Sequence, residues 1–199
     1  RNQENKDKES TKSVDDYQKP YWKKEAIGYS LEFLTSPAWM GIDRNRLAVS
    51  VFAGDADASF DQESYDIWIS FGISEKRIAK LPKKNNWWGP AGETGPCGPD
   101  TEMFIWTGDV DAPAEFDPEN QKWVEVWNDV FMEYDKKRKA QSEKGKILES
   151  AEADDYRYAK LAQRNVDTGM GLERMTAVLQ GASDNYQTDL FSAVIAKIE

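Results

Sequence analysis

Residues Asn165–Leu179 read NVDTGMGLERMTAVL, which predicts a glycine-rich turn leading into a short amphipathic helix. The helix carries Arg174 in its first turn, where a cation opposes the positive end of the helix dipole. Two glycines and the free backbone N–H groups at the helix start complete a candidate phosphate site around the guanidinium. Alternatively, Arg174 pairs with Glu173 or Asp167 and the glycines only shape the turn. The stretch alone leaves both readings open.

The composition narrows the class of protein. The chain has 199 residues, with eight each of Trp, Tyr and Phe, enough for one globular domain or one domain with an appendage. Its net charge of −10 argues against a broad basic surface, so we expect no DNA partner. The absence of histidine and the single Cys97 exclude an internal disulfide, histidine catalysis and a His-ligated or multi-cysteine metal site. No apolar run approaches the ~18 residues of a membrane span, so a cytoplasmic location is expected.

The N-terminal half predicts an α+β fold. The polar stretch 1–19 has few apolar side chains and predicts a flexible charged arm, with the globular domain at 20–199. The order helix, strand, helix, strand favours helices packed on one side of a sheet. The expected elements are a helix over Lys23–Leu34, a strand over Arg46–Phe52, a helix over Gln62–Phe71 capped by Asp61, and a short strand within Ile73–Leu81.

Three segments of the remaining chain have distinct patterns. Lys83–Asp100 holds four glycines and three prolines within eleven residues, which predicts a long shaped loop followed by a strand over Thr101–Trp106. Trp123–Tyr134 alternates as a central strand. Its Asn128 lies on an otherwise apolar face, where it either satisfies a buried backbone group or faces a ligand. The charged segment 136–162 predicts a solvated helical insertion or a mobile loop.

Four segments, taken in order, closely resemble the catalytic core of alanyl-tRNA synthetases, which are class II enzymes. The resemblance implies an antiparallel sheet flanked by helices, activation of alanine by ATP with Mg²⁺ to alanyl-adenylate, and transfer to tRNA(Ala). Because the alanine carboxylate is itself the nucleophile, this chemistry needs positioning and charge stabilisation and suits a chain without histidine. The segments are Tyr21–Ile27, Trp88 with Thr94–Pro99, Val126–Met132, and Asn165–Arg174 continuing through Ala177–Gly181, which looks like motif 3.

The resemblance also assigns roles to individual residues. Arg174 would contact the γ-phosphate of ATP, and Asp167 would hold the ammonium group of alanine; these two are the candidate catalytic residues. Asp167 could instead cap the following helix, and Trp88 could belong to the core. No residue is assigned as a metal ligand, although Glu102 is a weak candidate for Mg²⁺. The assigned set is Gly169, Gly171 and Arg174 for the nucleotide, and Trp88, Asn128, Asp167 and, in the pocket wall or lid, Gly95 for the amino acid.

The chain departs from the family pattern in two places. The family usually has a second cysteine after Pro99, where this chain has Asp100. Nothing before Tyr21 resembles motifs 1 and 2, the second of which carries the arginine that binds the α-phosphate. We therefore expect a fragment of an alanine–tRNA ligase core that works with a partner chain supplying motifs 1 and 2, its tRNA contacts largely absent. The alternative is a non-catalytic nucleotide-binding or assembly module derived from that core.

Overall fold

The computed structural model describes residues 21–139 and 156–198, so the predicted arm at 1–19 lies outside the described residues. Short 3-10 turns precede β1, β2 and α4. In chain order the helices and strands are α1 (Lys23–Thr35), β1 (Leu47–Phe52), α2 (Gln62–Ser70), β2 (Ile78–Leu81), β3 (Trp87–Trp88), β4 (Gly95–Trp106), β5 (Trp123–Arg138), β6 (Tyr156–Met170), α3 (Leu172–Gln180) and α4 (Asp189–Ile198).

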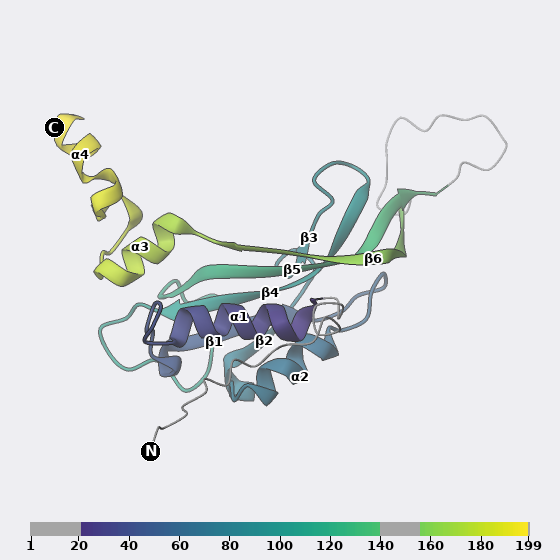
Figure 1. Ribbon diagram of the computed structural model, residues 1–199, viewed down its shortest axis with the longest axis horizontal. Coiled ribbons are helices and arrows are strands. Elements are labelled where there is room, and N and C mark those ends of the chain that lie inside the picture. The colour runs from purple at the N-terminus through teal and green to yellow at the C-terminus, as the bar shows by residue number, and fades with distance from the viewer. Residues whose placement is uncertain (1–20, 140–155, 199) are drawn as a thin grey trace, which may run out of the picture.

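The strands form a mixed sheet in the order β2-β1-β4-β5-β6, with β3 paired to β4 (Figure 1). β1 and β2 run parallel, while every other pairing among the described strands is antiparallel. The predicted α+β class with a mostly antiparallel sheet is confirmed. The predicted strand within Ile73–Leu81 is shorter than that range, because a 3-10 turn at Glu75–Arg77 precedes β2.

The main core lies between this sheet and helices α1 and α2, which cover the same side of it (Figure 1). In α1 the buried residues Ile27, Leu31 and Leu34 recur at the spacing of a single helix face. They pack with Trp68 of α2, whose indole N–H donates to the Thr101 hydroxyl at 2.8 Å. The two helices and the first strand are as predicted from the sequence.

A buried ion pair joins the starts of α1 and α2. Asp61 caps α2, as predicted, by accepting from the backbone N–H of Ser64 at 3.1 Å. The same carboxylate accepts from the Lys23 ammonium at 2.6 Å, with both side chains 3% exposed. Removing one partner would leave a buried charge without compensation, which typically costs about 3–5 kcal/mol.

The predicted loop over Lys83–Asp100 is wrong in its second half, where Gly95–Asp100 already belongs to β4. Pro99 fits because a register shift between Cys97 and Asp100 relaxes the ladder with β5, whereas Pro96 lies in register opposite Asp135. Gly98 lies in this irregularity, and a Cβ there would approach the Phe131 carbonyl oxygen to 2.0 Å. Only glycine therefore allows β4 to lie this close to β5.

The predicted insertion over 136–162 differs at both ends, because β5 extends to Arg138 and β6 begins at Tyr156. These ends pair directly, with Lys136 opposite Tyr158 and Arg138 opposite Tyr156. Charged side chains are compatible with a strand here because a two-stranded ribbon can expose both faces to water. The middle of the predicted insertion lies outside the described residues.

Candidate functional site

The face of the sheet opposite α1 and α2 carries the candidate site, and we call it the open face. Side chains alternate along a strand, so in β4 the core residues Met103 and Ile105 point to the helices while Glu102 points away. A register shift near Val126 of β5 places that residue in the helix-side core and Asn128, opposite Glu102, on the open face. The simple alternation predicted for Trp123–Tyr134 is therefore interrupted just before Asn128.

A polar network centred on Asp100 lies on the open face. Asn86, in the segment before β3, donates its amide N–H to Asp100 Oδ1 at 3.0 Å, and Asn128 of β5 donates to Asp100 Oδ2 at 3.4 Å. Asn86 also donates to the Ser50 hydroxyl at 2.8 Å, and Ser50 donates to Glu102 Oε2 at 3.4 Å. Four separate segments of the chain are thus linked by one network.

The two carboxyl groups of this network titrate near neutral pH. Burial raises the pKa of Asp100, which is 2% exposed, to about 7, against the opposing effect of the two asparagine donors. Burial also raises the pKa of Glu102 to about 8, and the negative charges of Asp100 and Glu125 add to the effect. The open face therefore holds acidic groups that are partly protonated at neutral pH and that lack a neighbouring cation at hydrogen-bond distance.

Arg174 lies in the first turn of α3, as predicted, but it pairs with neither Glu173 nor Asp167. Its Nη1 contacts a carboxylate oxygen of Glu125 at 2.5 Å and the Glu125 carbonyl oxygen at 2.8 Å. Gly171 is the N-cap of α3 and makes no side-chain capping bond, so Asp167 does not cap the helix. A Cβ at Gly171 would lie 3.1 Å from the Arg174 Nε, so this glycine leaves room for the arginine side chain.

β6 brings two more predicted residues to the open face. Gly169 lies opposite Asn128, and Asp167 lies opposite Val130, so both share the face of Asn128. A Cβ at Gly169 would meet no heavy atom within 4 Å, which leaves free space above the backbone. Asp167 is exposed, and it makes no hydrogen bond or ion pair with any part of the chain that the structure describes.

The two remaining predicted pocket residues lie farther along the strands. Trp88, on β3, is 37% exposed and pairs with Gly98, near the Asn86 end of the network. Gly95 pairs with Lys136 and lies seven residues before Glu102 on β4, roughly 20 Å away at about 3.3 Å per residue. The structure brings Asn128, Gly169 and Arg174 together but does not place Gly95 beside them.

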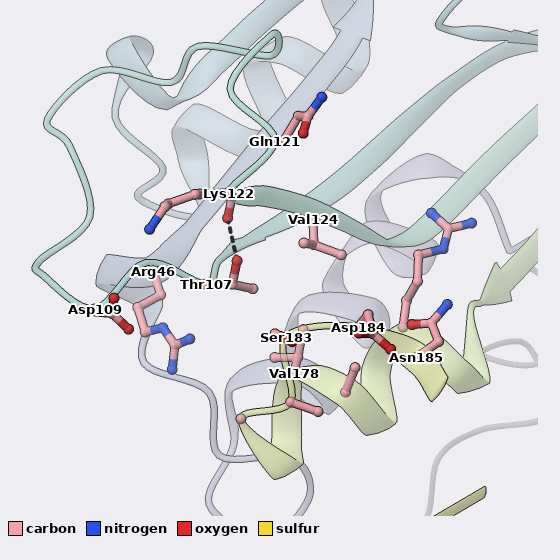
Figure 2. A pocket seen from close by; sticks show the side chains of 14 residues that line it. Arg46, Thr107, Asp109, Gln121, Lys122, Val124, Val178, Ser183, Asp184 and Asn185 are labelled. Atoms are coloured by element: carbon pink, nitrogen blue, oxygen red, sulfur yellow. Dashed lines mark hydrogen bonds between the residues drawn. The ribbon is translucent and has the colours of Figure 1, made fainter. Parts of the chain in front are cut away.

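Two hollows flank Arg174 and its partner Glu125. One, of about 480 Å³, lies over the open face and is lined by Glu102, Phe104 and Glu125 together with parts of Leu81–Asn85. The other, of about 460 Å³, lies between the start of β5 and helix α3 and includes Arg174 in its lining. In Figure 2, Val178, Ser183 and Asp184 face Arg46 and Lys122 across this second hollow.

The acidic residues of the site are the candidate ligands for the Mg²⁺ that the family resemblance implies. Within residues 21–139 and 156–198, no group of three or more acidic, histidine or cysteine residues could hold a metal ion. Mg²⁺ is commonly held by one or two carboxylates together with substrate phosphates. Glu102 and Glu125 line the same hollow and fit that limited role.

No helix in the described part of the chain is long and apolar enough to cross a membrane.

The chain was compared with known proteins. The family model for class II tRNA synthetases (A) matches residues 15–199. The alanine–tRNA ligase of Treponema denticola is 47% identical over 181 residues, which cover 90% of this chain and 28% of that relative. The alanine–tRNA ligase of Rubrobacter xylanophilus is 42% identical over 187 residues, which cover 89% of this chain and 19% of that relative. The chain thus spans less than a third of the length of these curated relatives.

Proposed function

Because the chain belongs to the class II tRNA synthetases (A), we propose that it forms part of the catalytic core of an alanine–tRNA ligase. In this role it activates alanine with ATP to alanyl-adenylate, and the assembled enzyme transfers the alanine to tRNA(Ala). We place the reaction in the cytoplasm.

The single observation that supports this function most is the position of Arg174. Its guanidinium lies at the start of α3 and close to Gly171, where an added Cβ would lie 3.6 Å from the guanidinium carbon. A phosphate that enters there meets backbone N–H groups, a helix dipole and a cation together. We assign Arg174 to the γ-phosphate, and we assign Gly169 and Gly171 the role of letting the nucleotide approach the protein backbone closely.

The acidic residues favour a cationic partner on the same face. Asp167 is exposed and lacks an ionic partner among the described residues, so it is available to the ammonium group of alanine. The neighbouring Asn128 shapes the amino-acid pocket with it. Glu102 and Glu125 would hold Mg²⁺ together with the phosphates, and the ion would supply charge neutralisation to the nucleotide.

One observation favours the alternative of a non-catalytic nucleotide-binding or assembly module. The Arg174 cation is already neutralised by Glu125, with the two side chains 45% and 30% exposed. A purely structural ion pair would account for that contact. For the catalytic function, a phosphate must compete with the Glu125 carboxylate, which an exposed pair permits because its net strength is small, at about 0–1 kcal/mol.

The test is alanine-dependent exchange of pyrophosphate into ATP by the purified chain, alone and after addition of a chain that carries motifs 1 and 2. Glycine and serine serve as comparison substrates, because a small pocket discriminates such side chains by only about 1–3 kcal/mol. We expect Arg174→Ala to reduce exchange about 100-fold or more. The matched control is Arg157→Ala, an exposed arginine near the far end of β6, which should leave exchange unchanged. Absence of exchange with and without the partner chain would contradict the function.

A further inference from the structure

Asp100 occupies the centre of the open-face network. Each of its carboxylate oxygens accepts one amide N–H, from Asn86 on one side and from Asn128 on the other. The two asparagines lie 42 residues apart in sequence, in different segments of the chain. One carboxylate therefore ties the segment that leads into the β3 tryptophans to the middle of β5.

The two asparagines share a second property. Their amide oxygens, Asn86 Oδ1 and Asn128 Oδ1, are both buried without a hydrogen-bond partner among the described residues. A carboxamide has a donor end and an acceptor end, and an ionised carboxylate can only accept. Both asparagines must therefore turn their N–H groups to Asp100 and their oxygens away from it.

We propose that Asp100 is a positioning residue for the amino-acid pocket: by accepting one amide N–H from each asparagine, its carboxylate fixes the orientation of Asn128 and thereby sets the affinity for the amino-acid substrate. This rests on the proposed function, in which Asn128 lines that pocket. Asp100 acts through Asn128 and need not touch the substrate, which fits its burial.

The donor and acceptor count makes the proposal specific. An asparagine at position 100, or a protonated Asp100, offers one acceptor and one donor in place of two acceptors. Only one of the two neighbouring amides can then keep its orientation, and the other must turn or lose its hydrogen bond. Asp100→Asn should therefore change the side-chain orientation or hydrogen bonding of Asn86, of Asn128 or of both.

Other charged groups near Asp100 have to be separated from this effect. Glu125 on β5 and Asp61 at the start of α2 both disfavour the ionised form of Asp100, and Glu102 lies two residues along the same strand. Glu125 and Asp61 each have a cationic partner of their own: Glu125 pairs with Arg174, and Asp61 pairs with Lys23. Glu102 is the group whose titration most resembles that of Asp100, because its pKa is also raised into the neutral range.

The first measurement is independent of activity. In the chain labelled with ¹⁵N-asparagine and held at one pH, the side-chain amide signals of both Asn86 and Asn128 should shift in Asp100→Asn, because the new side chain offers one acceptor in place of two. The control Glu102→Gln, which leaves both Asp100 acceptors in place, should shift the two signals less. Signals of Asn86 and Asn128 that stay unchanged in a folded Asp100→Asn chain would overturn the proposal.

The second measurement is the split between the KM values for alanine and ATP in pyrophosphate exchange. We expect Asp100→Asn to raise the KM for alanine about tenfold and to leave the KM for ATP within about twofold. The control Asp129→Asn removes an equally buried carboxylate on the helix-covered side, where it accepts from Ser30 and Thr168, and should not separate the two KM values.

An unchanged alanine KM, or parallel changes in both KM values, would overturn the positioning role and leave the proposed function intact. Absence of exchange in the unsubstituted chain, both alone and with the chain that carries motifs 1 and 2, would instead contradict the function, while the amide signals would still decide the role of Asp100.

Discussion

The same strands build two different surfaces on the two faces of the sheet. On the helix-covered face, Met103, Ile105 and Phe131 are at most 1% exposed and pack against α1 and α2. On the open face, the neighbouring positions carry Glu102 and Asn128, which take part in a polar network with raised carboxyl pKa values. The covered face thus holds the main core, whereas the open face combines two smaller apolar clusters with a charged network that the fold alone does not require.

The largest effect should come from the covered face. Phe131→Ala removes a fully buried ring that packs edge-on against Trp22 with centroids 5.4 Å apart, and we expect a loss of about 3–5 kcal/mol in the free energy of unfolding. Phe104→Ala removes a half-buried ring from the open face and should cost roughly 1–2 kcal/mol. Urea denaturation of both variants checks the comparison. Equal losses would show that the two faces contribute alike to stability.

A second comparison separates a structural glycine from a functional one. Gly98→Ala forces a Cβ against the Phe131 carbonyl oxygen, so we expect a loss of roughly 2–3 kcal/mol of stability. Gly169→Ala meets no atom within 4 Å and should leave stability within about 0.5 kcal/mol. If Gly169 serves the nucleotide, that variant should still weaken ATP binding, measured by calorimetry. A destabilised Gly169→Ala chain with normal ATP affinity would contradict this division.

The smallest expected effect, per pH unit and titrating group, is the pH dependence of stability. Asp100 and Glu102 have folded-state pKa values above their ordinary ones, so the folded chain holds protons that the unfolded chain releases. Their contribution is greatest when both are protonated and is lost as the pH rises toward about 7 and 8. We expect the free energy of unfolding to fall from pH 5 to pH 8 by up to about 1.4 kcal/mol per pH unit for each group below its pKa, and the slope to flatten in Glu102→Gln. A slope unaffected by that substitution would place the titrating groups elsewhere.

The sequence predicted those parts of the fold in which local pattern and tertiary packing agree. The spacing of apolar residues located α1 and α2, and Asp61 was identified as a cap because its side chain needs only local partners. The start of β4 was missed because its glycines and prolines indicate a loop, and only pairing with β5 makes Gly95–Asp100 a strand. The ends of β5 and β6 were missed because a solvent-exposed ribbon has no apolar alternation to detect.

The candidate site was predictable residue by residue but not as a network. The motif around Arg174 and the unusual polarity of Asn128 were visible in the sequence. The ion pair between Arg174 and Glu125 depends on how α3 packs against β5. That packing is a long-range feature that no local sequence pattern reveals. The convergence of Asn86 and Asn128 on Asp100 is likewise a long-range contact, signalled only by the replacement of a family cysteine.

The most direct test of the open face as the functional face is a titration of the ¹⁵N-labelled chain with ATP, Mg²⁺ and alanine, followed by backbone amide shifts. We expect shifts at Asn128, Gly169 and Arg174, with little change at Ile27 and Ser30 on the covered side. Shifts confined to the covered side, or no shifts at millimolar ligand, would contradict the functional role of the open face.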